Sequence, residues 1–304
     1  MDEPWEDINK AGKWLQHLAN KIKPDIIHFN HYAHAQLQWE APVVVVAHSC
    51  VYTWWQAVHG TPPPPQWKAY HDLVNNNIKA ANWVVSVSET FLKQFQQYYS
   101  NDYKSSIIHN GITFLAEKHL PKQEFIFAMG RIWDEAKNLA ILDQVAPHIP
   151  WKIEVAGDTF HPVLQCNQTL NCVEHLGLLD RAAVLQKLAQ ASIFIAPTKY
   201  EPFGLAPLEA AAQGCALVLA DLPSQREIWG DAAFYFNPYD TTSLINIINQ
   251  LIENEPLRKE YAQKAFAKSK YYTSATMADK YVKIYKYLLA QKKHSPGAKE
   301  MLNV

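Results

Sequence analysis

One stretch in the second half of the chain, Lys199–Asp221, restricts the fold more than any other part of the sequence. It reads KYEPFGLAPLEAAAQGCALVLAD. Apolar runs over 192–198 and 216–221 have the length and composition of buried parallel strands. Between them, Pro207 is typical of a helix start and Gly214 of a helix end. A strand, a helix and a second strand in this order predict one unit of a parallel α/β sheet.

The loop between the first of these strands and the helix is a candidate ligand site. We expect the helix to begin near Ala206, and N–H groups at a helix start attract electronegative groups such as phosphate or sugar oxygens. Gly204 has no Cβ, so a ligand can approach the backbone there. Glu201 and Glu209 bracket the turn. Taken alone, Glu201 is also explained as a solvated loop acid, and Glu209 as a first-turn acid that favours the helix dipole. The candidate N–H donors are those of Phe203, Gly204, Leu205 and Ala206.

Apolar runs alternate with helical patterns along the whole chain, which predicts two parallel sheets with helices on both faces. Strands are expected over 25–29, 43–49, 83–87 and 105–112, then over 125–130, 152–157, 172–177, 192–198, 216–221 and 232–238. Helices are expected over 4–22, from Ser88 as N-cap to about Tyr99, and over 138–147, 180–190, 206–213, 223–229, 240–253, 256–271 and 275–291.

A polar segment divides the two runs of alternation. Residues 116–124 read AEKHLPKQE and are interpreted as an interdomain linker. The predicted domains are therefore 1–115, 116–272 and a final segment over 273–304, which holds a helix and a tail.

The charge and the cysteines exclude several classes of protein. With 28 basic and 29 acidic residues the net charge is −1, which does not favour a nucleic-acid partner. The four cysteines form no CxxC pair, which favours reduced thiols and a cytoplasmic protein. No apolar run approaches the ~20 residues of a membrane span. Peripheral contact with the inner face of a membrane stays open, because the lysines near the C-terminus suit either a membrane surface or a solvated helix face.

The string from Glu201 to Gly214, with two glutamates in an E-x7-E spacing around PFGL and a following EAAAQG, resembles the donor-sugar signature of family 4 glycosyltransferases. These are retaining enzymes of the GT-B fold, in which two Rossmann-like α/β domains face a cleft. The resemblance runs along nearly all of the chain, and the final helical segment is similar to the family's helix that crosses back to the first domain. It implies that Glu209 holds ribose hydroxyls and that Glu201 lies near the sugar. It also implies that the amides of Phe203, Gly204 and Leu205 reach sugar or phosphate oxygens, with the base near Leu178 and Asp158 at the edge of the same pocket.

A second motif, GRIWDEAKN over 130–138, resembles the family's phosphate motif and maps its two cations to Arg131 and Lys137. Arg offers a planar fork for phosphate oxygens and Lys a compact charge, so both suit a diphosphate. In isolation, each residue is better explained as a solvated surface cation, and the position of both after a predicted strand favours the functional interpretation. The sequence has no Asp-x-Asp pair, which is the usual carboxylate site for a divalent metal on a sugar diphosphate. We therefore expect metal-independent activity without a cofactor.

His48 ends the run VVVVAHS, where the family commonly has a histidine that faces the donor sugar. A satisfied buried histidine is the alternative interpretation. Tyr52, Trp54 and Trp55 follow it and suit either a sugar-binding surface or the core. Asn110 and Gly111 resemble a structural Asn-Gly turn near the family's hinge.

The chain departs from the family at its start. Family members open with a strand and a glycine-rich loop, whereas this sequence begins at the helix before PDIIHFN. We therefore expect an incomplete first domain whose sheet edge is exposed or otherwise covered, with donor binding retained.

The function expected from the sequence is transfer, with retention, of a hexose, glucose first, from a UDP-sugar to a bacterial polysaccharide or glycolipid. The alternatives are a non-catalytic nucleotide-sugar binder or partner subunit and, more weakly, a UDP-sugar epimerase on the same fold.

Overall fold

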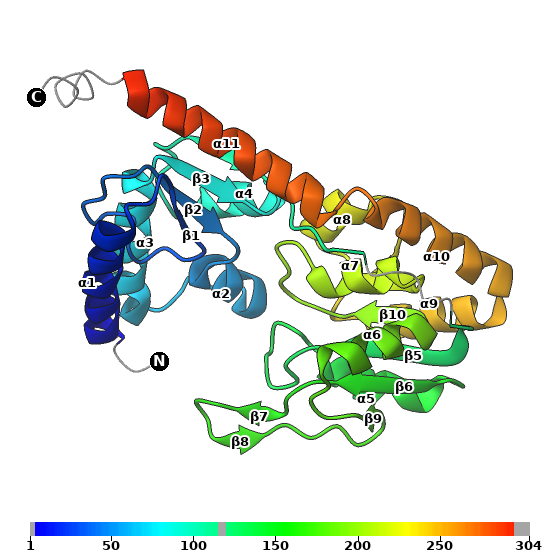
Figure 1. The fold of residues 1–304 in the computed structure, drawn as a ribbon. Helices are drawn as coiled ribbons and strands as arrows, with labels where there is room; N and C mark the ends of the chain where they lie inside the picture. Colours follow the sequence, from blue (N-terminus) through cyan, green and yellow to red (C-terminus); the bar gives the residue numbers. More distant parts are fainter. Residues whose placement is uncertain (1–3, 115–119, 295–304) are drawn as a thin grey trace, which may run out of the picture. The chain divides into compact units, whose positions relative to one another are not determined.

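The computed structural model describes residues 4–114 and 120–294 of the chain (Figure 1). Its contacts divide the chain into two compact units. The first unit takes in most of the chain up to His109 together with the residues from Met277 onward. The second unit takes in 110–276 together with the short segment 57–60. The predicted domain boundary at 115/116 and residues 116–119 of the predicted linker lie outside the described residues.

The first unit contains a sheet of four parallel strands in the order β1-β2-β3-β4. The strands are β1 (Ile27–Phe29), β2 (Val43–Ala47), β3 (Trp83–Ser86) and β4 (Ser105–Ile107). β2 is buried along its whole length, as its run of four valines predicts. β1 and β4 form the two edges of this sheet. The predicted strand over 105–112 ends at Ile107, because the chain beyond it turns away and Ile112 pairs with Thr273 instead.

The helices of the first unit include two that the sequence analysis did not predict. They are α1 (Trp5–Ile22), most of α2 (Val51–His59), the 3-10 turn η1 (Pro65–Trp67), α3 (Lys68–Ala80), α4 (Glu89–Phe95) and most of α11 (Ser274–His294). Ser88 accepts a hydrogen bond from Phe91 N at 3.1 Å and caps α4 as predicted. α2 and α3 were missed because tryptophan-rich and asparagine-rich segments have low helix propensity, and packing overrides it here.

The second unit contains a six-stranded parallel sheet in the order β12-β11-β10-β5-β6-β9. Its strands are β5 (Gln123–Met129), β6 (Lys152–Ala156), β9 (Glu174–His175), β10 (Ala191–Ala196), β11 (Ala216–Ala220) and β12 (Phe234–Phe236). Its helices are α5 (Ala140–Val145), the turn η2 (Ala146–His148), α6 (Arg181–Gln190), α7 (Leu205–Ala212), α8 (Pro223–Trp229), α9 (Thr241–Glu253) and α10 (Glu255–Ser269). An antiparallel hairpin of β7 (Phe160–His161) and β8 (Cys166–Asn167) was not predicted.

Helices cover both faces of this sheet (Figure 1). Successive side chains of each strand point alternately to one face and to the other. Ile126, Ile153 and Ile193 point to the face that packs against α5 and α9, where they form one apolar core. The opposite face packs against α6, α7 and α10. There Glu154 is fully buried and forms ion pairs with Lys152 and with Lys187 of α6. The core therefore fixes β5, β6 and β10 side by side, and with them the loops that leave their carboxyl ends.

The carboxyl ends of β5 and β6 approach each other more closely than side chains allow. A Cβ added to Gly157 would lie 1.7 Å from Gly130 O, and Gly157 has a φ of +157°. Gly157 N donates to Gly177 O at 2.9 Å, and Ile132 N donates to Asp158 O at 2.8 Å. These bonds hold the three loops after β5, β6 and β9 together.

Replacing Gly157 with Ala is expected to lower the free energy of unfolding by about 1–3 kcal/mol, because the new methyl group overlaps backbone that cannot move aside. Gly230→Ala is the matched control: Gly230 has a φ of +56° and nothing near its Cβ position. It should cost only its backbone strain of about 1–3 kcal/mol, whereas Gly157→Ala carries such strain and the steric overlap in addition. Urea denaturation of both variants measures the difference, and equal midpoints would contradict the close contact.

Candidate functional site

The loop after β5 carries Arg131, the first of the two predicted cations. Arg131 Nε donates to Asp134 Oδ2 at 3.2 Å and Nη2 donates to the same oxygen. The guanidinium carbon lies 5.1 Å from the centre of the Trp133 ring. The Arg131 side chain is still 59% exposed, whereas Asp134 is buried and accepts a hydrogen bond from Ala136 N. Asp134 thus fixes the guanidinium, and more than half of the Arg131 side chain stays exposed to solvent.

Lys137, the second cation, joins this loop to the loop after β10. Its Nζ lies 2.8 Å from Glu201 Oε2, and the two side chains are 28% and 16% exposed. Ser224 Oγ donates to Glu201 O at 2.6 Å and fixes the backbone of the same loop. The structure therefore brings together Lys137 and Glu201, which lie in two separate sequence motifs.

Two further contacts brace the same pair of loops. Asn138 has a φ of +52°, and its Nδ2 donates to Pro197 O and Pro238 O, each at 2.9 Å. Lys199 N donates to Ala136 O at 2.8 Å, and Lys199 Nζ pairs with Glu135 at 3.2 Å. Because Asn138 is used as a brace, α5 begins at Ala140 and not at the predicted residue 138.

Helix α7 begins at Leu205, one residue earlier than predicted, so two details of the sequence analysis were wrong. Pro207 is the third helical residue and not the first, and Glu209 lies beyond the first turn. Gly204 precedes the helix with a φ of +96°, and Leu208 N makes the first helical hydrogen bond, to Gly204 O. Within the described residues, the N–H groups of Gly204, Leu205 and Ala206 have no hydrogen-bond partner. These three amides remain as donors for a ligand.

The predicted residue Phe203 contributes its backbone to this turn and not its ring. The side chain is buried and meets the Tyr272 ring edge-on at a centroid distance of 5.6 Å. Buried Gln225 donates through Nε2 to Phe203 O at 3.0 Å. A Cβ at Gly204 would lie 3.2 Å from that amide nitrogen, so this tight turn favours glycine.

Glu209 forms an ion pair that the sequence analysis missed. Arg181 Nη1 lies 2.8 Å from Glu209 Oε1, and the side chains are 65% and 15% exposed. Arg181 is the first residue of α6, whose N-cap Asp180 accepts from Ala183 N at 2.8 Å. The helix predicted over 180–190 includes Arg181, but nothing in the sequence paired this residue with Glu209.

Leu178 and Asp158, the predicted base-side residues, lie in neighbouring loops after β9 and β6. Leu178 is 76% exposed and follows Gly177, whose carbonyl accepts from Gly157 N. Asp158 Oδ1 accepts from Phe160 N at 2.9 Å, so one carboxylate oxygen organises the start of the β7–β8 hairpin. His161 of that hairpin packs on Trp133 at a centroid distance of 4.9 Å.

His48 belongs to the first unit, at the carboxyl end of β2. His48 Nε2 lies 2.9 Å from Asn30 Oδ1. Burial lowers the pKa of His48 below its ordinary value of 6.5, and the nearby His28 lowers it further. Burial also lowers the pKa of His28, whose Nδ1 lies 2.5 Å from Tyr285 Oη. His48 is thus a solvent-accessible histidine that is hydrogen-bonded to Asn30 and neutral near pH 7.

The aromatic residues after His48 have different roles. Tyr52 packs against the rings of His71, Tyr98 and Tyr99, in agreement with the core interpretation for this residue. Trp54 and Trp55 contact each other edge-on at 6.1 Å and are half-buried.

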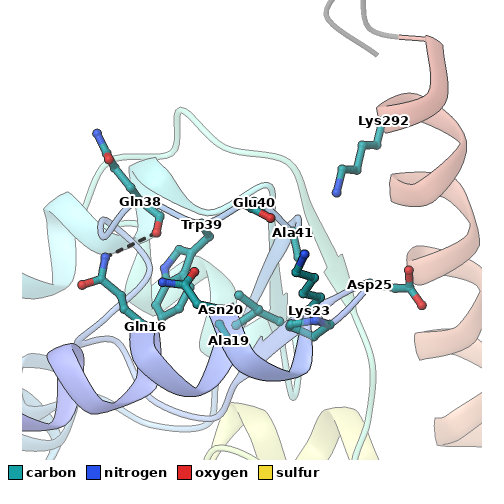
Figure 2. A pocket seen from close by; sticks show the side chains of 12 residues that line it. Gln16, Ala19, Asn20, Lys23, Asp25, Gln38, Trp39, Glu40, Ala41 and Lys292 are labelled. Atoms are coloured by element: carbon teal, nitrogen blue, oxygen red, sulfur yellow. Dashed lines mark hydrogen bonds between the residues drawn. The ribbon is translucent and has the colours of Figure 1, made fainter. Parts of the chain in front are cut away.

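The first unit also has a cavity of about 530 Å³ at the amino ends of β1 and β2 (Figure 2). Trp39, the end of α1 and Lys292 of α11 line it, and Gln16 Nε2 donates to Gln38 O at 3.4 Å across one wall. None of the predicted site residues lines this cavity.

The described part of the chain holds neither a membrane-spanning helix nor a cluster of metal-ligating side chains. No helix there is long and apolar enough to cross a membrane. No three or more His, Cys, Asp and Glu side chains there are grouped so that they would hold a metal ion.

Comparison with protein families gives two matches that together span most of the chain. Residues 113–268 match the model of glycosyl transferases group 1. Residues 3–114 match the model of glycosyltransferase family 4.

Curated relatives are distant. The O-antigen chain mannosyltransferase RfbU of Salmonella typhimurium is 23% identical over 198 residues, which cover 59% of this chain and 53% of that protein. An N-acetylgalactosaminyltransferase of Campylobacter jejuni that acts on a diphospho-undecaprenol substrate, according to its name, is 26% identical over 193 residues, covering 58% of this chain and 52% of that protein. The matches thus span about half the length of these relatives.

Solved structures show the same fold at low sequence identity. Sucrose-phosphate synthase from Thermosynechococcus elongatus superposes with a TM-score of 0.81 at 16% identity, over 95% of this chain and 80% of that one. Anabaena HepE in complex with UDP superposes with a TM-score of 0.73 at 18% identity, over 92% and 82%. These similarities confirm the predicted α/β fold of the GT-B class.

Three histidines of the first unit, His28, His31 and His48, make its stability depend on pH. Their folded-state pKa values lie below 6.5, so the unfolded chain binds more protons once the pH falls below 6.5. The free energy of unfolding should therefore decrease as the pH falls from 6.5 toward the folded-state pKa values, and recover above that window. Melting curves at about pH 7.5 and about pH 5.5 should show this loss, and His28→Gln should reduce it.

His17→Gln is the matched control, because His17 is exposed on α1. The control should lose as much stability as the unmodified chain. A His28 variant that behaves like the control would show that the burial of this imidazole does not cause the loss.

Proposed function

The chain belongs to the family of glycosyl transferases group 1, and on this premise we propose that it is a glycosyltransferase whose second unit binds a nucleotide sugar. The proposed donor site is the set of loops at the carboxyl ends of β5, β6, β9 and β10. Ligands of open parallel sheets bind at this edge. The residues that carry the proposal are Arg131, Lys137, Glu201, Glu209 and the three amides at the start of α7.

The observation that supports the proposal most directly is the Lys137–Glu201 ion pair at 2.8 Å. It connects the loop with the Arg131 guanidinium to the loop with the unpaired amides of Gly204 and Leu205. A diphosphate needs several donors within a few ångströms, and helix N-termini and Arg or Lys side chains are the groups that proteins use for it.

Each residue has a proposed task in the transfer. Arg131 and Lys137 bind the diphosphate and stabilise the negative charge that grows on it as the bond to the sugar breaks. Glu201 orients Lys137 and lies beside the sugar. Glu209 accepts hydrogen bonds from the ribose, and the exposed backbone near Leu178 and Asp158 borders the base.

We propose a retaining reaction without an enzyme nucleophile. The acceptor hydroxyl attacks the anomeric carbon on the face that the diphosphate leaves, and a departing phosphate oxygen takes the hydroxyl proton. The protein contributes position and electrostatics. Because two fixed cations already serve the diphosphate, we propose that no metal is required. The role of His48 beside the donor sugar remains a prediction from the family resemblance.

A UDP-hexose, with glucose as the first candidate sugar, is the proposed donor, and a bacterial polysaccharide or glycolipid the proposed acceptor. UDP-glucose is bound by Anabaena HepE in a structure with a TM-score of 0.71, whereas RfbU is named as a mannosyltransferase, which makes mannose the second candidate. We propose a cytoplasmic location on the basis of cysteine usage. A thermal-shift screen with UDP-, GDP- and ADP-sugars separates the donors, because a ligand bound only by the folded chain raises its melting temperature.

Removing either cation should weaken nucleotide binding. Arg131→Ala and Lys137→Ala are each expected to weaken UDP binding by about 1.5–3 kcal/mol, roughly ten- to a hundredfold, because each loses a charge-assisted hydrogen bond. Titration calorimetry measures the change. Lys259→Ala, which removes an exposed lysine paired with Glu255 on α10, is the control and should bind like the unmodified chain. Unchanged affinity in both site variants would remove the phosphate assignment.

Donor hydrolysis separates an enzyme from a non-catalytic binder. Incubated with UDP-glucose and EDTA but no acceptor, a transferase should slowly release UDP and glucose, because water replaces the acceptor hydroxyl. Coupled detection of UDP measures this rate. Tight UDP binding without hydrolysis, and without transfer in cell extract, would favour the binder, and conversion of the sugar without release of UDP would favour an epimerase.

A further inference from the structure

Arg181 lies on the side of the proposed donor site where the family resemblance places the ribose. It is the first residue of α6, and its guanidinium reaches across to α7, where Nη1 lies 2.8 Å from Glu209 Oε1. Arg181 is 65% exposed, whereas Glu209 is only 15% exposed. The exposed guanidinium of Arg181 is thus paired with a Glu209 carboxylate that is mostly covered by the protein.

Only one of the two carboxylate oxygens of Glu209 accepts a hydrogen bond from another described residue. Arg181 occupies Oε1, and within the described residues Oε2 has no hydrogen-bond partner. An ionised carboxylate can only accept hydrogen bonds, so a ligand at this position must offer donors. The two neighbouring hydroxyls of a ribose are such donors.

A glutamate side chain has several rotatable bonds, and fixing it costs conformational entropy. An ion pair that exists before the ligand arrives removes much of that cost at binding. It also places a positive charge beside the carboxylate, which would otherwise repel the diphosphate of the same ligand.

We propose that Arg181 is a positioning residue that orients the Glu209 carboxylate toward the ribose hydroxyls, and thereby makes the site select ribonucleotides over 2′-deoxyribonucleotides. This inference rests on the proposed function, and it adds a residue from a different element to the donor site.

The test compares UDP with 2′-deoxy-UDP by titration calorimetry on the full chain. The unmodified chain should prefer UDP by about tenfold, the worth of one hydrogen bond to a charged group. Arg181→Ala should reduce this preference to about twofold or less, since Glu209 then turns freely. Arg181→Lys should restore part of the preference, and Lys259→Ala should leave it unchanged. Glu209→Gln should lose the preference as well, and adding Arg181→Ala to it should have little further effect.

Three results would overturn the assignment. The first is that Arg181→Ala keeps both the preference and the affinity for UDP of the unmodified chain. The second is an equal loss of UDP and 2′-deoxy-UDP affinity in that variant, which would place Arg181 on the phosphates. The third is equal affinity for both nucleotides in the unmodified chain, which would remove Glu209 from the ribose. Failure of the unmodified chain to bind UDP, GDP or ADP at all is a distinguishable result, and it would overturn the proposed function together with this inference.

Discussion

The ion pair between Lys137 and Glu201 is the contact on which the proposed site depends. It joins two loops that are 64 residues apart in sequence and leave neighbouring strands. Partly buried ion pairs contribute little net stability, because desolvation offsets the attraction between the charges. Their geometric effect is larger: the amine of Lys137 cannot move away from the start of α7 without leaving the covered Glu201 carboxylate unpaired. Asn138 and Ser224 fix the backbones of the same two loops, so the position of the pair follows from the sheet.

Four cations after β5, β9 and β10 each pair with a carboxylate: Arg131 with Asp134, Lys137 with Glu201, Arg181 with Glu209 and Lys199 with Glu135. Lys122, at the opposite end of β5, shows a contrasting arrangement. Its Nζ donates to the carbonyls of Leu188, Ala191 and Gln213, and burial lowers the pKa of this amine. All three N–H donors of Lys122 bond to carbonyls at the ends of α6 and α7, so this lysine has a structural role. The Arg131 and Arg181 side chains are 59% and 65% exposed, so their guanidinium groups are accessible to an anion.

The strand–helix alternation and the order of the motifs could be predicted from sequence because they depend on local patterns. Buried runs such as 43–47 and 216–220 indicate their strands by composition alone. The elements that the sequence did not predict correctly are those whose formation or length depends on tertiary contacts or whose strands are very short. α2 and α3 form because packing overrides propensity, and α5 is shortened because Asn138 braces two other loops. The β7–β8 hairpin has strands of only two residues, too short for a periodic signal. Arg181 was missed because pairing between residues 28 positions apart leaves no mark in a single sequence.

Pro207 reduces the number of backbone N–H groups that the start of α7 offers to a ligand. A helix normally leaves its first N–H groups unpaired, and any of them can bind a ligand. Here Pro207 is the third helical residue and has no N–H, and Leu208 N already bonds to Gly204 O. The available donors are therefore restricted to Gly204, Leu205 and Ala206. Gly204 reaches its conformation because no Cβ meets Gln225, and Gln225 in turn holds Phe203 O. The amides lie on the chain between Glu201, which holds Lys137, and Glu209, which is held by Arg181. The turn is thus fixed from both flanks by ion pairs, and the groups left unpaired are hydrogen-bond donors of the kind that a sugar diphosphate needs.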